Sequence, residues 1–182
     1  MSARALRSSR EHWKALPGPL RRSGVALWLR HEESLTERIS SRSSRFEVRV
    51  LRQGFARLLP DEARLLGLQR IRRVQVREVL LCADERVLVF ARSLIACSSR
   101  PWREWHDLGA RPLAGLLFRD PAVSRTGLAF RRLGPEDPRV RAARAASGAQ
   151  GPLWARRRSF LRRGSPLLLT EVFLPAILEL GS

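Results

Sequence analysis

Glu171 is a charged residue in an apolar segment, where it could transfer a proton. The segment Leu167–Pro175 predicts a strand in which Glu171 shares a face with Leu167, Leu169 and Phe173. Removing a carboxylate from water raises its pKa and suits it to proton transfer near neutral pH. The alternative is that both faces of the strand are partly covered and the carboxylate pairs with an arginine, which is the commoner arrangement.

Arg77 occupies a comparable position on an earlier predicted strand, where its face includes Val79 and Leu81. A guanidinium in an apolar crevice can hold a carboxylate through two parallel hydrogen bonds, a geometry that lysine cannot reproduce. The alternatives are a solvent-facing arginine at a sheet edge or a cross-strand pair with a glutamate. Together, Arg77 and Glu171 suggest a site for a small anion.

The other candidate residues carry weaker signals. His12, His31 and His106 are far apart and lack the spacing of a metal site or a catalytic triad, so we expect exposed or core histidines. Glycine-rich phosphate loops are also absent from the sequence. The run Trp154–Arg158 mixes an aromatic ring with cations, as single-strand nucleic-acid binders do. In a strand, this run is more simply a solvated face beside a packed tryptophan.

Composition favours one globular domain. The chain has 182 residues, of which 44% are hydrophobic, and this is enough for a core. It carries 35 Lys and Arg against 17 Asp and Glu, a formal charge of +18. Such a charge is typical of proteins that bind nucleic acid or anionic membranes. The basic residues are scattered from Arg4 to Arg163, however, and this spread fits a compositional preference equally well.

The sequence contains neither a membrane-spanning apolar stretch nor a secretory signal. Cys82 and Cys97 lack the number and spacing of a disulfide framework or a zinc site. We therefore expect a soluble protein in a reducing cytoplasm, with no metal.

The pattern of apolar residues predicts an α+β domain over residues 23–182, preceded by a basic and flexible arm over residues 1–22. Six strands joined mostly by hairpin-length connections predict one antiparallel sheet, covered on one face by helices. A site would then lie on the other face or in a crevice between helices and sheet. The predicted strands are 46–50, 71–83, 87–96, 126–133, 154–161 and 167–174. Helices are predicted over 24–40 and 60–66, two short ones within 101–118, and a solvated loop or weak helix over 134–152.

Two long segments of unusual composition carry a family resemblance: Arg77–Asp84 (REVLLCAD) and Pro166–Pro175 (PLLLTEVFLP). Shorter matches occur in family order within residues 25–175, at Trp28-Leu29, Glu33–Thr36, Arg52–Phe55, Leu108-Gly109, Pro112-Leu113, Leu153-Trp154 and Arg156-Arg157. In these segments the chain closely resembles the chorismate lyases of bacterial ubiquinone biosynthesis.

The resemblance implies a six-stranded antiparallel sheet with helical flaps over a buried pocket. It implies conversion of chorismate into 4-hydroxybenzoate and pyruvate without a cofactor, the first committed step toward ubiquinone. By motif, Arg77 would hold the ring carboxylate with help from the backbone N–H groups of Leu35 and Leu113. Glu171 would lie at the hydroxyl end as acid or base. Ala114 stands where a relative has Gly.

Other functions stay open beside this resemblance. One is a sensing domain that binds a small aromatic acid on the same fold, although the first 40 residues show no helix-turn-helix. Another is a nucleic-acid binder, which a steep salt dependence would identify. We expect a monomer without a specific nucleic-acid partner. Its charge could steer dianionic chorismate or support weak peripheral attraction to an acidic membrane.

Overall fold

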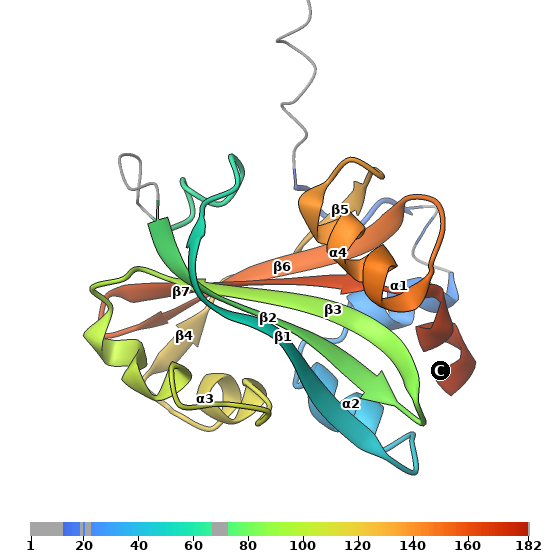
Figure 1. The fold of residues 1–182 in the computed structure, drawn as a ribbon, viewed down its shortest axis with the longest axis horizontal. Coiled ribbons are helices and arrows are strands. Elements are labelled where there is room, and N and C mark those ends of the chain that lie inside the picture. Colours follow the sequence, from blue (N-terminus) through green and yellow to red (C-terminus); the bar gives the residue numbers. More distant parts are fainter. Residues whose placement is uncertain (1–12, 19, 21–22, 67–72, 182) are drawn as a thin grey trace, which may run out of the picture.

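Seven strands form one antiparallel sheet, which confirms the predicted α+β class (Figure 1). The structure is a computed structural model that describes residues 13–18, 20, 23–66 and 73–181. The strand order is β1-β2-β3-β7-β6-β4, and β5 pairs with β6 beside β4. The strands are β1 (Phe46–Arg57), β2 (Arg73–Ala83), β3 (Arg86–Ile95), β4 (Val123–Arg125), β5 (Ala129–Leu133), β6 (Leu153–Arg162) and β7 (Ser165–Phe173). The helices are α1 (Gly24–Leu29), α2 (Leu35–Ser40), η2 (Arg100–Trp105), α3 (Ala114–Phe118), α4 (Pro138–Ser147) and η3 (Pro175–Leu180).

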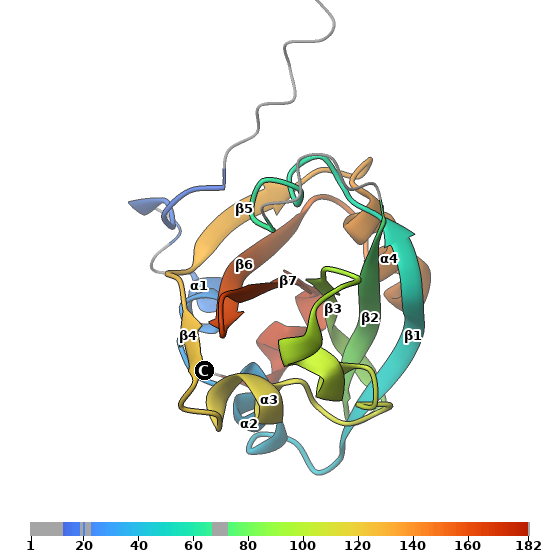
Figure 2. The ribbon, with the colours of Figure 1, turned by 90° about the vertical axis from the view of Figure 1, so that its left-hand side faces the viewer.

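The central strands β2, β3 and β7 are covered on both faces. α1, α2, η2 and α3 pack on one face, whereas α4 and residues 58–66 pack on the other. Figure 2 shows the sheet curling between β1 on one side and β4 on the other, with α2 and α3 lying between these edges. Burial on both sides explains the nearly continuous apolar sequence of the central strands. The expectation of helices on one face only was wrong.

The strand that the prediction missed is the shortest one of the sheet. Six strands were predicted, and the described residues contain seven, because β4 has three residues and is too short for an alternating pattern. The two predicted hairpins are confirmed as β2–β3 and β6–β7. The two short helices predicted within 101–118 are confirmed as η2 and α3.

The predicted helix over residues 24–40 is instead two helices with a break at residues 30–34. The break arises because Ser34 caps a new helix: its Oγ accepts a hydrogen bond from the backbone N–H of Glu37 at 3.1 Å. The chain between α1 and α2 therefore exposes backbone carbonyl groups that an unbroken helix would use internally.

Residues 134–152 contain a packed helix rather than a solvated loop. Asp137 caps the start of α4 by accepting a hydrogen bond from the N–H of Arg139, and Gly148 ends the helix with a φ of 69°. Val140 and Ala143 are fully buried against the sheet. The predicted helix over residues 60–66 was wrong, because this segment forms turns.

Part of the predicted N-terminal arm is docked on the domain. Lys14 and Phe130 of β5 exchange two backbone hydrogen bonds of 3.0 and 2.8 Å. The indole N–H of Trp13 donates to Asp61 at 2.8 Å, and the guanidinium of Arg157 lies 4.2 Å from the centre of a Trp13 ring. The prediction of flexibility falls mainly on residues 1–12, which lie outside the described residues.

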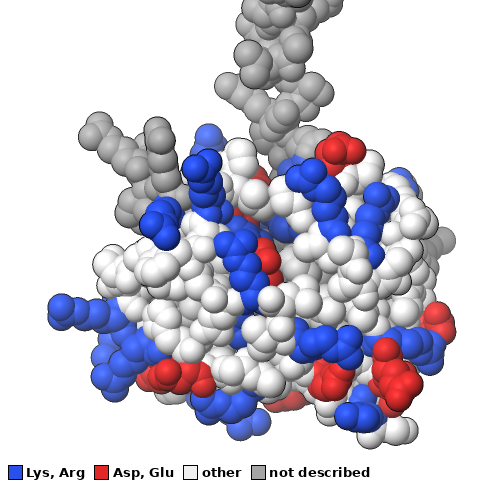
Figure 3. All heavy atoms as spheres, in the orientation of Figure 1, with Lys and Arg blue, Asp and Glu red and all other residues white. Residues whose placement is uncertain are grey.

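The positive charge does not gather in one patch on the face shown in Figure 3. Lys and Arg side chains are spread across this face, and Asp and Glu side chains lie beside several of them. Other arginines are buried in the interior, among them Arg77, Arg92, Arg139 and Arg156. Several of the arginines that give the sequence its positive charge are thus part of the protein interior.

A buried ion cluster ties residues 58–66 to the sheet. Arg92 on β3 donates from Nε to Glu62 Oε1 at 2.8 Å and also pairs with Glu78 on β2. The Glu62 side chain is fully buried, and it accepts a further hydrogen bond from the N–H of Leu59 at 2.8 Å. Each buried charge therefore depends on its partner.

We predict that Glu62→Ala lowers the free energy of unfolding by about 3–5 kcal/mol, because it leaves Arg92 buried with less compensation. Urea denaturation measures this loss. The matched control is Glu136→Ala at an exposed position, which should change stability by no more than about 0.5 kcal/mol. Equal effects of the two substitutions would contradict a structural role for the cluster.

Candidate functional site

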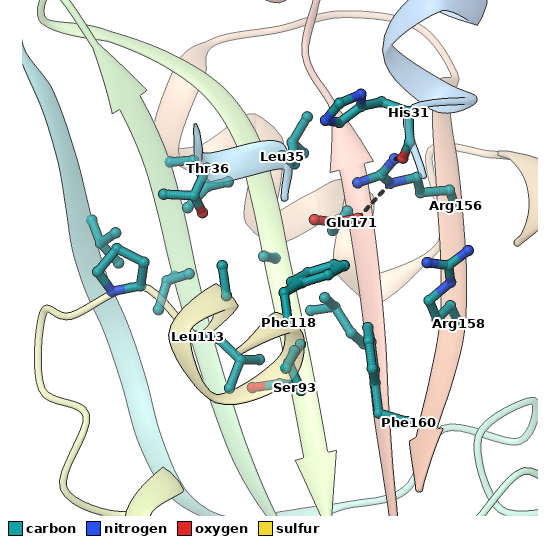
Figure 4. A pocket seen from close by; sticks show the side chains of 18 of the residues that line it. His31, Leu35, Thr36, Ser93, Leu113, Phe118, Arg156, Arg158, Phe160 and Glu171 are labelled. Carbon is teal, nitrogen blue, oxygen red and sulfur yellow. Dashed lines mark hydrogen bonds and ion pairs between the residues drawn. The ribbon is translucent and has the colours of Figure 1, made fainter. Parts of the chain in front are cut away.

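A pocket lies in the crevice between the sheet and two helical segments. We call residues 24–40, with α1 and α2, the first flap, and residues 100–118, with η2 and α3, the second flap. The first flap contributes Leu35 and Thr36 to the pocket wall, and the second contributes Leu113 and Phe118 (Figure 4). The floor consists of side chains from β2, β3, β7 and β6.

Strand register sets the order of side chains on this floor. Two neighbouring cross-strand rows run from β2 to β6. One row consists of Val79, Ala91, Glu171 and Arg156, and the next consists of Arg77, Ser93, Leu169 and Arg158. Charged groups thus enter an otherwise apolar floor from β2, β7 and β6.

Glu171 forms an ion pair inside the pocket. Its Oε2 accepts a hydrogen bond of 2.5 Å from Arg156 Nε, and both residues are buried (Figure 4). Arg156 Nη1 also donates to the carbonyl oxygens of Leu29 at 3.2 Å and His31 at 2.5 Å. Glu171 therefore pairs with an arginine, as the second of the two alternatives predicted, and the same carboxylate also lines the pocket.

Arg77 is a buried cation without a carboxylate partner in the described part of the chain. Its Nη2 donates to the carbonyl oxygens of Gly109 at 2.8 Å and Arg111 at 3.0 Å, which fixes the second flap. Its Nε is buried and has no hydrogen-bond partner in the described residues. Burial lowers the pKa of Arg77 to about 10, so the group stays cationic at neutral pH. An anion in the pocket would supply the missing acceptor.

Arg156 and Arg158 show that the interpretation of Trp154–Arg158 as a solvated face was wrong. Both arginines are buried and line the pocket, while Arg157 points away and pairs with Asp61. The signal in the sequence was the alternation of Arg156 and Arg158 with their neighbours on one strand. Whether these two arginines are solvated or buried depends on the two flaps, which cover that face of the sheet.

A comparison with known families identifies the chain. The family described as chorismate lyase matches residues 19–180. The chain belongs to the chorismate lyase family. A protein of Azoarcus sp. (strain BH72) named "Probable chorismate pyruvate-lyase" is 46% identical over 180 residues, covering 95% of this chain and 95% of the relative. A protein of the same name from Aromatoleum aromaticum is 46% identical over 181 residues, covering 96% of this chain and 98% of the relative.

Solved structures with a similar fold include a domain of a repressor and an effector domain. The C-terminal domain of the histidine utilization repressor from Pseudomonas syringae pv. tomato matches with a TM-score of 0.56 at 12% identity, covering 72% of this chain and 93% of that domain. The effector domain of PhnF from Mycobacterium smegmatis matches with a TM-score of 0.56 at 13% identity, covering 79% and 89%. At such identities, the similarity shows only that this member of the chorismate lyase family has the same fold as these domains.

The four residues predicted for the site of this chorismate lyase family member, Arg77, Glu171, Leu35 and Leu113, line the same pocket. Leu35 is the first residue of α2 and Leu113 is the N-cap of α3, positions where backbone N–H groups lack acceptors within the helix.

The histidines have separate surroundings. His31 lines the pocket, and burial, followed by the charge of Arg38, lowers its pKa. His106 is exposed, and His12 lies outside the described residues. No group of three or more His, Cys, Asp or Glu side chains within residues 13–18, 20, 23–66 and 73–181 is arranged to hold a metal ion. None of the described helices has the length and apolar character needed to cross a bilayer.

We predict that benzoate, a probe with one carboxylate, binds the pocket and raises the melting temperature, and that Arg77→Gln weakens this binding at least about tenfold. Calorimetric titration measures the affinity. Because the pKa of Arg77 is about 10, the affinity should be level at neutral pH and fall as the pH rises through that value. Arg132→Gln, at an exposed position of β5, is the control. Unchanged benzoate binding in Arg77→Gln would exclude Arg77 as the anion site.

Proposed function

We propose that this chain is a chorismate pyruvate-lyase that converts chorismate into 4-hydroxybenzoate and pyruvate without a cofactor, supplying the first committed step toward ubiquinone. The observation that carries the proposal is that one covered pocket holds both Arg77, a cation without an anionic partner among the described residues, and the buried carboxylate of Glu171. Family membership supports the same reaction class.

The proposed orientation of the substrate follows from the rows of the floor. The ring carboxylate would accept hydrogen bonds from Arg77 and from the backbone N–H groups of Leu35 and Leu113. The ring would lie between the apolar walls, with Leu169 beneath it. Its C4 end would then lie near Glu171, which is in the row next to that of Arg77.

The reaction needs orientation and one acid or base. The C3–O bond breaks, a proton leaves C4, and the ring becomes aromatic, while the departing enolpyruvate takes up a proton and becomes pyruvate. Aromatisation makes the overall reaction favourable, so fixing the substrate and moving the proton are the main tasks of the protein. Glu171 would act as the base at C4 or, when protonated, as the acid toward enolpyruvate. Arg156 would hold its carboxylate in place.

The decisive experiment mixes the purified protein with chorismate in buffer containing a metal chelator and follows both products. We expect 4-hydroxybenzoate and pyruvate in equal amounts. Formation of neither product would overturn the proposed activity.

A substitution tests the role of Glu171. Glu171→Gln keeps the shape of the side chain but removes its acid–base function, so we expect kcat to fall by at least about 100-fold while 4-hydroxybenzoate still binds. The control is Glu136→Gln at an exposed position, which should leave kcat unchanged. A Glu171→Gln variant with the kcat of the original protein would remove this residue from the mechanism.

A second candidate function is a sensor of small aromatic acids. Two of the similar solved structures are named as a ligand-binding domain and an effector domain, and this likeness of fold supports the alternative. Tight 4-hydroxybenzoate binding without turnover would support this alternative. For either function we propose a monomer with a cytoplasmic location, in keeping with the free thiols of Cys82 and Cys97.

A further inference from the structure

Arg158 is a second buried arginine with an unused donor in the pocket. Only 6% of its side chain is exposed, and its Nε is buried without a hydrogen-bond partner among the described residues. The same is true of Arg77 Nε. By contrast, Arg156 uses its Nε for Glu171 and its Nη1 for carbonyl groups of the first flap. On β6, Arg158 is therefore an arginine whose Nε has no partner among the described residues, whereas the Nε of Arg156 is used by Glu171.

Arg77 and Arg158 stand at opposite ends of one cross-strand row. Ser93 and Leu169 lie between them, on β3 and β7. Because neighbouring strands are roughly 4.8 Å apart, three such spacings separate the two arginines by roughly 14 Å at their Cα atoms. Both arginines line the pocket, so a small ring with an acidic group on each side is a ligand that would match the two cations.

Glu171 is placed between these two cations. It lies two residues from Leu169 on β7 and faces the same side of the sheet. A ligand that spans Arg77 and Arg158 would therefore pass over Leu169, with its middle portion beside the carboxylate of Glu171.

The present partner of Arg158 is an exposed residue of the first flap. Arg158 Nη1 donates to the carbonyl oxygen of Glu32 at 3.0 Å, and its Nη2 pairs with the Glu32 carboxylate. The side chain of Glu32 is 59% exposed, so water can solvate its carboxylate when the pair opens. Arg158, by contrast, is buried and needs an anion in place of Glu32, so a carboxylate of the ligand is the group that would replace this partner.

We propose that Arg158 binds a second carboxylate of the substrate, the one on the enolpyruvyl group, in competition with Glu32. The identity of that substrate rests on the proposed function, whereas the two-carboxylate geometry does not. Arg77 then holds the ring carboxylate, which substrate and product share, and Arg158 holds the carboxylate that leaves with pyruvate. Arg158 thereby favours the dianionic substrate over the monoanionic aromatic product.

Binding of two non-reacting probes tests this inference. The first is 3-(1-carboxyvinyloxy)benzoate, an aromatic ether that carries both carboxylates and whose ring is already aromatic, so no elimination can follow. The second is benzoate, which carries one. In calorimetric titrations, we expect Arg158→Met to weaken binding of the dicarboxylate roughly 10-fold to 100-fold, and to change benzoate affinity by no more than about twofold. Arg132→Met on β5 is the matched control and should change neither.

Benzoate binding also shows whether the Arg158→Met variant is folded. Arg158→Lys is a second variant, which keeps the positive charge but lacks the Nε donor and should lose part of the dicarboxylate affinity. An unchanged dicarboxylate affinity in both variants, or an equal loss for both probes, would overturn the inference.

Substitution of Glu32, the partner of Arg158 in the structure, should have the opposite effect on dicarboxylate binding. Glu32→Gln removes the competing carboxylate, so we expect tighter dicarboxylate binding and unchanged benzoate binding. Weaker or unchanged dicarboxylate binding in Glu32→Gln would contradict the competition.

Kinetics separate this inference from the proposed function. With an active lyase, Arg158→Met should raise KM for chorismate while inhibition by 4-hydroxybenzoate stays the same. Turnover by the original protein together with an unchanged KM in Arg158→Met would overturn the inference and leave the lyase intact. Absence of turnover together with Arg158-dependent dicarboxylate binding would overturn the lyase and support the role of Arg158.

Discussion

A guanidinium taken out of water must find acceptors for its N–H groups, and this requirement organises the pocket. Arg77, Arg156 and Arg158 project from the sheet into a covered space. Their acceptors are largely backbone carbonyl groups of the two flaps, which are free because the chain there is broken into short helices. The flaps cannot move from the sheet without leaving these cations unsatisfied.

The same cations give the pocket its chemical character. Each flap occupies some of the donors, while Arg77 Nε and Arg158 Nε have no hydrogen-bond partner among the described residues. The pocket is thus ordered before a ligand enters, which reduces the conformational entropy lost on binding. Arg156 adds a further constraint, because it connects Glu171 to the carbonyl groups of the first flap.

The spacing of apolar and charged residues along the sequence predicted those elements that neighbouring residues form among themselves. Strands β2, β3 and β7 were evident from their apolar residues, and Arg77 and Glu171 stood out as charges on apolar faces. Arg156 and Arg158 did not, because arginines on this face of β6 are buried only when the two flaps cover it, and that is a property of the whole fold. The division of residues 24–40 depended on a single cap at Ser34. β4 was missed because it is very short, and α4 was predicted only as a solvated loop or weak helix because it has few apolar residues.

The strand order has a consequence for the way in which the molecule forms. β1, β2 and β3 are neighbours in both sequence and space, and β6 and β7 form a second local group. Only the pairing of β3 with β7 joins these groups, and it closes a long intervening segment, which makes it a slow contact to establish. Arg77 belongs to the first group, whereas Glu171, Arg156 and Arg158 belong to the second. A half-assembled chain therefore has no complete pocket, and a ligand of the site stabilises only the finished molecule.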